Sequence, residues 1–286
     1  MKNNTHEWTT TIQPQTGWLD VNLKEVWKYR DLILLFVKRD IITKYKQTVL
    51  GPLWLIFTPL ISTLISTFVF GTIAGIETGT VPYFMFYFCG STAWTYFATC
   101  ITSTSSTFTA NASIFGKVYF PRLTMPFSAV ITALVSFGVQ FAMMIGFMVY
   151  FSVKGAAIQP VWNMLWMLPI LLLQMALLGL GCGIILSSLT TKYRDLVSLI
   201  TFGVDAWRYV TPVIYLVSSL PKKYQQVSLI NPMSPIIEAF RYICLGEGGG
   251  ELMVTPLLFS WGETLVILFC GIILFSRVEK TFMDTV

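Results

Sequence analysis

The sequence predicts an all-α integral membrane protein. Its six transmembrane helices follow an N-terminal amphipathic helix on the membrane surface, and short re-entrant or gate helices lie on the outer side. The 286-residue chain is 55% hydrophobic, only 12% charged, and has a mean hydropathy of +0.68. Soluble domains carry about 25% charged residues. Six mostly apolar segments are long enough to span a bilayer, and most lysines and arginines lie between them on one side.

The chain divides into a cytoplasmic N-terminal part at 1–52, a transmembrane domain at 53–276 and a short cytoplasmic C-terminus at 277–286. Each predicted span is a run of about 20 mostly apolar residues, the length that crosses the hydrocarbon core. The six spans cover residues 53–75, 82–103, 126–151, 164–188, 196–217 and 257–276. The two longest connections are an inner loop at 104–125 and an outer loop at 218–256.

Charge predicts that both termini are cytoplasmic. Cytoplasmic loops of membrane proteins carry an excess of lysine and arginine. Of the 19 lysines and arginines, Arg208 lies within a span. If the N-terminus is cytoplasmic, only four of the others lie on the outer side: Lys154, Lys222, Lys223 and Arg241. The remaining fourteen lie on the cytoplasmic side. We therefore expect a multi-pass membrane protein with both ends on the cytoplasmic side.

Residues 19–41 are predicted to form a helix that lies on the membrane. Its apolar face carries Val26, Trp27, Ile33, Leu34, Val37 and Ile41. Lys24, Lys28 and Lys38 fall on another face. Because a span begins shortly afterwards, we interpret this segment as an interfacial helix. An ordinary soluble amphipathic helix is the alternative.

The second span is rich in aromatic side chains. Tyr83, Tyr87 and Trp94 share one helical face, and Phe97 follows. Aromatic rings offer flat apolar surfaces to the C–H faces of sugars, so this row is a candidate lining for a substrate pathway. Tyr83 and Tyr87 also lie near the outer membrane boundary, where a lipid-facing aromatic belt is the alternative.

Asp205 and Arg208 form an intramembrane charged pair near the middle of the fifth span. Charged groups in a membrane are costly and usually face the bundle interior or a wet cavity. Their spacing puts both on one helical face, where each can neutralise the other. The pair either touches sugar hydroxyls or phosphate in a pathway, or locks the fifth span to its neighbours.

Gly179 and Gly183 make a G-x-x-x-G pattern in the fourth span. Small residues let helices approach closely in lipid. We expect this face to pack inside the bundle rather than to form a seam between two copies.

Several functions are disfavoured by the sequence. No glycine-rich P-loop motif is present, so the chain is not expected to bind ATP in that manner or to be an enzyme. His6 is the only histidine and the five cysteines lack metal-ligand spacing, so no metal site is expected. The net charge of +5 collects at segment ends, which does not indicate nucleic-acid binding.

Four strings, in order, resemble the permease subunits of bacterial ABC polysaccharide exporters, which move O-antigen, teichoic acid or capsular chains. They are KYKQTVLGPLWLIFTP at 44–59, KVYFPRLTMP at 117–126, TPVIY at 211–215 and NPMSPIIEAFR at 231–241. The resemblance extends from about residue 20 to the end of the chain.

This resemblance implies a homodimer of permeases above two nucleotide-binding subunits, which would hold ATP and Mg²⁺, so this chain itself needs no cofactor. The loop after the second span would couple to the ATPase through Ile114, Phe115, Lys117, Tyr119 and Phe120. Short outer gate helices would use Asn231, Pro232, Glu238 and Arg241. Gly51 and Pro52, between the interfacial helix and the first span, become a candidate hinge.

The predicted function is ATP-driven export of a lipid-linked polysaccharide across the cytoplasmic membrane. One alternative is an ABC exporter of lipids or drugs, whose pathway need not be lined by aromatics. A second alternative is an ion-coupled secondary transporter. That class needs titratable groups in mid-membrane and often has inverted repeats. The sequence shows one charged pair in mid-membrane and no repeat.

The outer loop at 218–256 contains a predicted short helix from residue 236 to 245. Its apolar residues include Ile236, Phe240 and Ile243. A short apolar segment of this kind is often re-entrant or interfacial. A surface helix packed on the outer ends of the spans is the alternative.

Overall fold

The computed structural model describes residues 23–46, 48–115, 120–190, 193 and 195–285, and these contain helices but no strands. The α-helices are α1 (Leu23–Lys28), α2 (Arg30–Tyr45), α3 (Trp54–Ser66), α4 (Tyr83–Ser105), α5 (Thr107–Phe115), α6 (Thr124–Val153), α7 (Met167–Thr190), α8 (Leu196–Val210), α9 (Lys222–Ile230), α10 (Met233–Leu245) and α11 (Val254–Thr285). A π-helix, η2 (Thr67–Ile73), continues α3. The 3-10 helices are η1 (Gly51–Leu53), η3 (Trp162–Met164), η4 (Val217–Ser219) and η5 (Glu247–Gly249).

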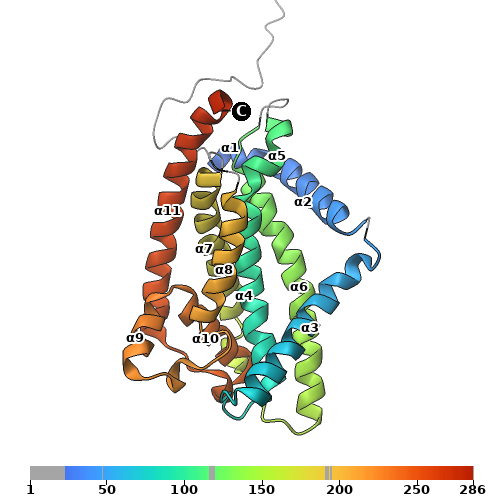
Figure 1. Ribbon diagram of the computed structural model, residues 1–286, viewed down its shortest axis with the longest axis vertical. Coiled ribbons are helices and arrows are strands. Elements are labelled where there is room, and N and C mark those ends of the chain that lie inside the picture. The colour runs from blue at the N-terminus through green and yellow to red at the C-terminus, as the bar shows by residue number, and fades with distance from the viewer. Residues whose placement is uncertain (1–22, 47, 116–119, 191–192, 194, 286) are drawn as a thin grey trace, which may run out of the picture.

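The long helices run side by side along the long axis of the molecule (Figure 1). Helices α1, α2 and α5 lie at one end, and α9 and α10 lie at the other (Figure 1). This arrangement matches the sequence prediction in which the first amphipathic helix and the loop after the second span share one side of the membrane. The short helices α9 and α10, from the predicted outer loop at 218–256, lie at the opposite end.

Four helical segments are long and apolar enough to cross a membrane. They are Gly51–Ile73, Thr124–Val153, Met167–Thr190 and Val254–Arg277. Helix α4 has 23 residues, but its many Ser, Thr, Tyr and Trp side chains reduce its hydropathy. Helix α8 has only 15 residues, fewer than the roughly 20 that span a bilayer. The all-helical membrane fold is confirmed, whereas the count of six spans stays a prediction.

Helix α8 ends earlier than the fifth predicted span. The span is expected to reach residue 217, but the helix stops at Val210. Thr211 is extended, with φ −85° and ψ 142°. The cause is Pro212, because a proline ring disfavours the helical conformation of the residue before it. Asp205 and Arg208 therefore lie near the end of a short helix and not in the middle of a long one.

Helix α4 is the centre of the bundle, and glycines bring α7 against it. A Cβ atom added to Gly179 would lie 2.6 Å from Cys100 Cβ, and one added to Gly183 would lie 2.5 Å from Thr104 Cβ. The opposite face of α7 meets α11, where a Cβ on Gly271 would lie 2.8 Å from the Gly181 carbonyl oxygen. The predicted packing of the glycine face inside the bundle is confirmed.

The first span is packed far less than α4 or α7. Only 6% of its most apolar stretch is buried, against 56% for the corresponding stretch of α7. In Figure 1, α3 crosses obliquely in front of the bundle instead of running parallel with it. Its outer part, the π-helix η2, touches α4 at Gly71, where an added Cβ would lie 2.8 Å from the Tyr83 ring. One side of α3 thus faces the bundle and the other is uncovered.

The amphipathic N-terminal segment is divided into α1 and α2 at Tyr29, whose φ of −93° and ψ of 21° interrupt the helix. Ile33, Phe36 and Val37 form the buried face of α2. Trp27 and Leu34, predicted to share this apolar face, are 69% and 61% exposed. The predicted apolar face is therefore only partly buried: one side of α2 packs against the protein, and Trp27 and Leu34 are left uncovered.

Candidate functional site

Three adjoining cavities form a groove, and α3 lines the first and third of them. Their volumes are about 390, 450 and 570 Å³. The first and second cavities share Lys44, Thr99, Ala133 and Ser136. The first and third share Trp54, Thr58, Ser62 and Arg208. We call this continuous space the groove. It runs from the end of α2, past α4 and α6, to the end of α8.

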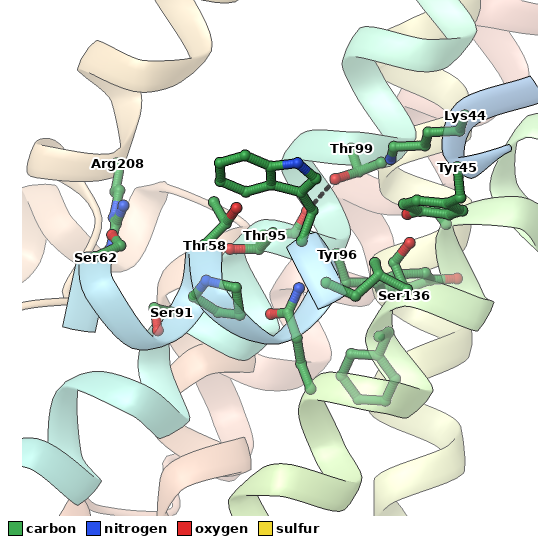
Figure 2. A pocket seen from close by; sticks show the side chains of 16 residues that line it. Lys44, Tyr45, Thr58, Ser62, Ser91, Thr95, Tyr96, Thr99, Ser136 and Arg208 are labelled. Carbon is green, nitrogen blue, oxygen red and sulfur yellow. Dashed lines mark hydrogen bonds between the residues drawn. The ribbon is translucent and has the colours of Figure 1, made fainter. Parts of the chain in front are cut away.

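Figure 2 shows the first cavity of the groove. Lys44 and Tyr45, from the end of α2, lie at one side of the view, and Arg208, from α8, lies at the other with Ser62 beside it. Thr58 and Thr95 lie between them. Side chains from five helices thus meet around one space, although they come from segments far apart in the sequence.

Hydroxyl side chains line the groove at every fourth position on three helices. The row on α3 is Thr58, Ser62 and Ser66, the row on α4 is Ser91, Thr95, Thr99 and Ser103, and the row on α6 is Ser128, Thr132 and Ser136, followed by Gln140. Residues four apart lie on the same face of an α-helix, one above the other. The three rows therefore give the groove a polar lining along its length.

Many of these hydroxyls donate their proton to their own helix. Thr99 Oγ1 donates to the Thr95 carbonyl at 2.7 Å, Ser91 Oγ to the Phe88 carbonyl at 3.0 Å, and Thr132 Oγ1 to the Ser128 carbonyl at 2.9 Å. A hydroxyl that donates in this way still has lone pairs that accept. The lining is consequently rich in acceptors and suits a ligand that carries many O–H donors.

Three polar groups in the groove have no hydrogen-bond partner among the described residues. Arg208 Nε and the Tyr45 hydroxyl are buried and unpaired. The Gln140 side chain is 6% exposed, lines the first cavity and has no hydrogen bond to a described residue. Leaving a buried polar group unpaired costs about 1–3 kcal/mol. Such groups, gathered around one cavity, make it a candidate binding site.

The expected ion pair between Asp205 and Arg208 does not form in this structure. Within the described part of the chain, no ion pair of 4.0 Å or less joins them. Asp205 is exposed, whereas Arg208 lines the groove together with Thr58 and Ser62 of α3. The two share a helix, but Arg208 reaches across to α3, so its charge belongs to the groove.

The predicted aromatic row does not line the groove. Tyr87, Trp94 and Phe97 are buried, with 1%, 2% and 0% of their surface exposed, while Tyr83 is 40% exposed. The Trp94 and Phe97 rings contact Trp207 of α8 at centroid distances of 6.0 and 5.4 Å. Because α4 is covered on nearly every side, this face is filled by its neighbours. In a single copy Tyr87, Trp94 and Phe97 pack against neighbouring helices and Tyr83 stays partly exposed, so a pathway role for this row stays a prediction.

The predicted coupling residues lie at the end of the molecule occupied by α1, α2 and α5. Ile114 lines the second cavity and is half-buried. Phe115 is only 7% exposed and stacks on Phe120 at 5.6 Å, and Phe120 contacts Phe36 of α2 at the same distance. Phe115 is thus part of an internal cluster and not a free docking side chain. Lys117 and Tyr119 lie outside the described residues.

Arg39 adds a polar tie between α2 and the predicted coupling segment. One guanidinium nitrogen lies 2.7 Å from Asp40 Oδ1 and also donates to Asn111 Oδ1 of α5 at 3.1 Å. Together with the contact between Phe36 and Phe120, this bond fixes α2 to the loop after α4. A displacement of that loop would be passed to α2 and to the groove beside it.

The predicted outer gate residues form a buried hydrogen-bonded node. Arg241 has no exposed surface, pairs with Glu238 at 2.9 Å and donates to the Pro212 carbonyl at 2.7 Å. Its guanidinium lies 4.1 Å from the centroid of the Phe86 ring of α4. Burial lowers the pKa of Arg241, and the Glu238 carboxylate opposes that shift by favouring the charged form.

Asn231 and Pro232 extend this node. Asn231 Nδ2 donates to Thr211 Oγ1 at 2.8 Å, and Ser260 Oγ of α11 donates to the Pro232 carbonyl at 2.7 Å. Ile236, Phe240 and Ile243 of α10 are all buried. Of the two interpretations of this helix, packing on the outer ends of the long helices describes the structure. These residues join the end of α8 to α10 and α11.

Gly51 has φ of +51°, a conformation that L side chains rarely adopt, and Pro52 begins η1 directly after it. The chain turns here from α2 into α3 (Figure 1). Glycine is required because its missing Cβ makes positive φ inexpensive. The position is a sharp joint between the N-terminal helix and one wall of the groove.

The hydroxyl rows are functional candidates that the sequence prediction missed. Their signal was present, because Ser128, Thr132 and Ser136 stand four apart in an apolar segment. Among the described residues, no group of three or more His, Cys, Asp or Glu side chains lies close enough to hold a metal ion.

Comparison with known proteins places the chain in a family. The family model described as ABC-2 type transporter matches residues 31–245. The chain is 28% identical over 255 residues to a protein named O-antigen export system permease protein RfbA from Klebsiella pneumoniae, which covers 89% of this chain and 94% of that relative. A protein of the same name from Myxococcus xanthus is 24% identical over 268 residues, covering 92% and 98%. Because the family model spans most of its length, the chain belongs to the ABC-2 type transporter family.

Proposed function

We propose that this chain is the membrane permease of an ATP-driven exporter that moves a lipid-linked polysaccharide, of the O-antigen or teichoic acid class, across the bacterial cytoplasmic membrane. Relatives named as O-antigen export permeases align with nearly the whole chain. The single structural observation that carries the proposal is the groove, because rows of hydroxyl acceptors suit a ligand built of sugars.

The transporter contains two copies of the chain and two nucleotide-binding subunits. ATP and Mg²⁺ bind to those subunits, and the permease itself is not an enzyme. Support comes from the family match and from the lack of a P-loop in this sequence. The uncovered apolar faces of α3 and α8, with Ile61 and Phe202 51% and 73% exposed, offer surfaces for the second copy.

All six predicted spans cross the membrane in this proposal, with α4 shielded from lipid by its neighbours and the uncovered face of α8 covered by the second copy. Both termini are cytoplasmic, so α2 and α5 lie at the inner face, and α9 and α10 act as gate helices at the outer face. The short length of α8 is accommodated because it packs against α4 and continues into the node around Arg241.

Closure of the two ATPases on ATP moves the loop after α4. The Phe36, Phe115 and Phe120 contacts carry that motion into α2, and the Gly51 joint converts it into a change in the angle of α3. Since α3 is one wall of the groove, its movement widens or narrows the groove. ATP hydrolysis and the path of the polysaccharide are coupled in this way.

Deletion of the gene in its native host tests the proposal. Surface polysaccharide should disappear and lipid-linked glycan should accumulate at the inner face, with both defects reversed by the wild-type gene. Immunoblots of glycans from intact and permeabilised cells measure the two pools. Unchanged surface glycan together with lost lipid or drug efflux would instead identify another kind of ABC exporter. Activity that depends on an ion gradient, without a co-purifying ATPase, would identify a secondary transporter.

A further inference from the structure

We infer that the groove inside one copy of the chain binds the end of the substrate where the first sugar joins its lipid-linked phosphate. This inference rests on the proposed function and adds a location, a ligand chemistry and recognising residues. Arg208 binds the phosphate, Lys44 adds positive charge at the other side of the same cavity, and Gln140 and the hydroxyl rows bind the sugar.

The charge of the groove favours an anion. Arg39, Lys44 and Arg208 are its cationic lining residues, and Asp40 is the one acidic residue among the described residues that line it. Arg39 and Asp40 neutralise each other at 2.7 Å. Two positive charges remain without an ion-pair partner in the described part of the chain. A phosphate or diphosphate supplies the missing negative charge.

Arg208 is placed to bind such a group directly. Its Nε is buried without a partner, and its side chain lines the groove at the point where the first and third cavities meet. A guanidinium forms paired hydrogen bonds to phosphate oxygens because its planar donors match their spacing. Thr58 and Ser62 of α3 line the same part of the groove and are available to orient the anion.

Gln140 is placed to recognise a sugar. Its buried amide both donates and accepts, as neighbouring hydroxyls of a sugar also do. The Tyr45 hydroxyl, buried and unpaired, lines the same cavity. Trp54, Tyr96 and Phe137 line it as well, and flat rings pack against the C–H faces of a sugar. Phosphate and sugar recognition are thus adjacent in one cavity.

Direct binding tests this assignment on the full transporter, permease and ATPase together, in nanodiscs of phosphatidylcholine. The probe is a short-chain polyprenyl diphosphate that carries one sugar. The comparison ligands are the same diphosphate without sugar, the free sugar, inorganic diphosphate and phosphatidylglycerol. Intrinsic fluorescence, to which Trp54 in the groove contributes, gives the affinity.

Arg208→Gln should weaken probe binding by about tenfold to hundredfold, the loss typical of a charged hydrogen-bonding partner. Arg208→Lys keeps the charge but loses the paired donors, so its affinity for the probe should lie between those of the wild type and Arg208→Gln. Gln140→Leu should weaken the sugar-bearing probe by about fivefold and leave the sugar-free diphosphate unchanged. Arg30→Gln and Gln226→Leu, at exposed positions away from the groove, are matched controls and should bind as the wild type.

Three outcomes would overturn the inference. The first is unchanged probe affinity in both Arg208→Gln and Arg208→Lys. The second is that phosphatidylglycerol competes with the probe as well as the sugar-free diphosphate does, which would indicate a general site for lipid headgroups. The third is that the control variants lose as much probe affinity as the groove variants. Export in cells separates this failure from failure of the proposed function. If wild-type complementation restores surface glycan while groove variants bind and export normally, only the groove assignment is wrong. If the probe binds as described but deletion leaves surface glycan intact, only the polysaccharide export function is wrong.

Discussion

Arg241 shows how a charged residue can be fully buried near the outer end of a membrane protein. Its Nη2 atom binds the Glu238 carboxylate and the Pro212 carbonyl, and its guanidinium lies over the Phe86 ring, while Nε and Nη1 have no hydrogen-bond partner among the described residues. Glu238 also accepts from the Val217 amide at 3.2 Å. Removing one partner of a buried ion pair is worse than removing both, because the remaining charge has no compensation.

Arg241→Met should therefore destabilise the protein by about 3–5 kcal/mol, and the double variant Arg241→Met with Glu238→Gln should recover part of that loss. Thermal unfolding of the purified protein in detergent measures both. Arg30→Met, at an exposed site, serves as the control and should change little. Equal destabilisation by the single and double variants would contradict the argument.

Phe120 lies where α2 meets the loop after α4, so its side chain tests the proposed coupling. Phe120→Leu keeps much of the apolar volume but loses the ring contacts with Phe36 and Phe115. We expect export to fall several-fold while ATP hydrolysis continues, since the loop would move without carrying α2. Export assays and phosphate release measure the two activities.

Phe269→Leu, an equivalent change at a 58% exposed side chain of α11, is the control for this experiment. Parallel loss of export and ATP hydrolysis in Phe120→Leu would indicate a folding defect instead of uncoupling.

At the scale of elements, the contact between α4 and α7 depends on glycine. Gly183→Ala would place a Cβ 2.5 Å from Thr104 Cβ, a separation that real Cβ contacts essentially never show. The helices would have to separate, with an expected loss of about 1–3 kcal/mol, typical of overpacking. Thermal unfolding is the measurement.

Gly138→Ala in α6 is the matched control, because a Cβ there would meet nothing within 4 Å. Alanine favours an α-helix over glycine by about 1 kcal/mol, so this variant should be unchanged or slightly stabilised. If Gly183→Ala were as stable as Gly138→Ala, the close approach of α7 to α4 would not require glycine at this position.

The sequence predicted helix type and position well where the apolar pattern is long and uninterrupted, as in α6, α7 and α11. Prediction was weaker where tertiary contacts decide the structure. Pro212 ended α8 early, although the hydropathy continued beyond it. The aromatic face of α4 is predicted to line a pathway because rings suit sugars, whereas within one copy Trp207 from a distant segment packs against it. Periodicity alone does not reveal which face a neighbouring helix will bury.

At the scale of the whole molecule, the groove is continuous only because its three cavities share residues. Ser136 lines both the first and the second cavity. Ser136→Trp should fill that junction and lower export by more than tenfold, while the protein still assembles with its ATPase. Glycan blots and co-purification measure these outcomes.

Thr255→Trp, at an exposed position near the start of α11, is the control for the filled groove. Its export should resemble the wild type, because a large side chain there enters no described cavity. Normal export by Ser136→Trp would mean that the substrate travels elsewhere, for example between two copies of the chain.

The hydroxyl rows also have a kinetic consequence. Positions four apart on a helix repeat about every 6 Å along its axis, so each row presents nearly identical acceptors at regular intervals. A long polymer that advances by one interval exchanges each bond for an equivalent one, and its energy barely changes. Resistance to movement then depends on local exchange with water and not on total length. The time needed to export each added sugar should therefore be the same for short and long chains.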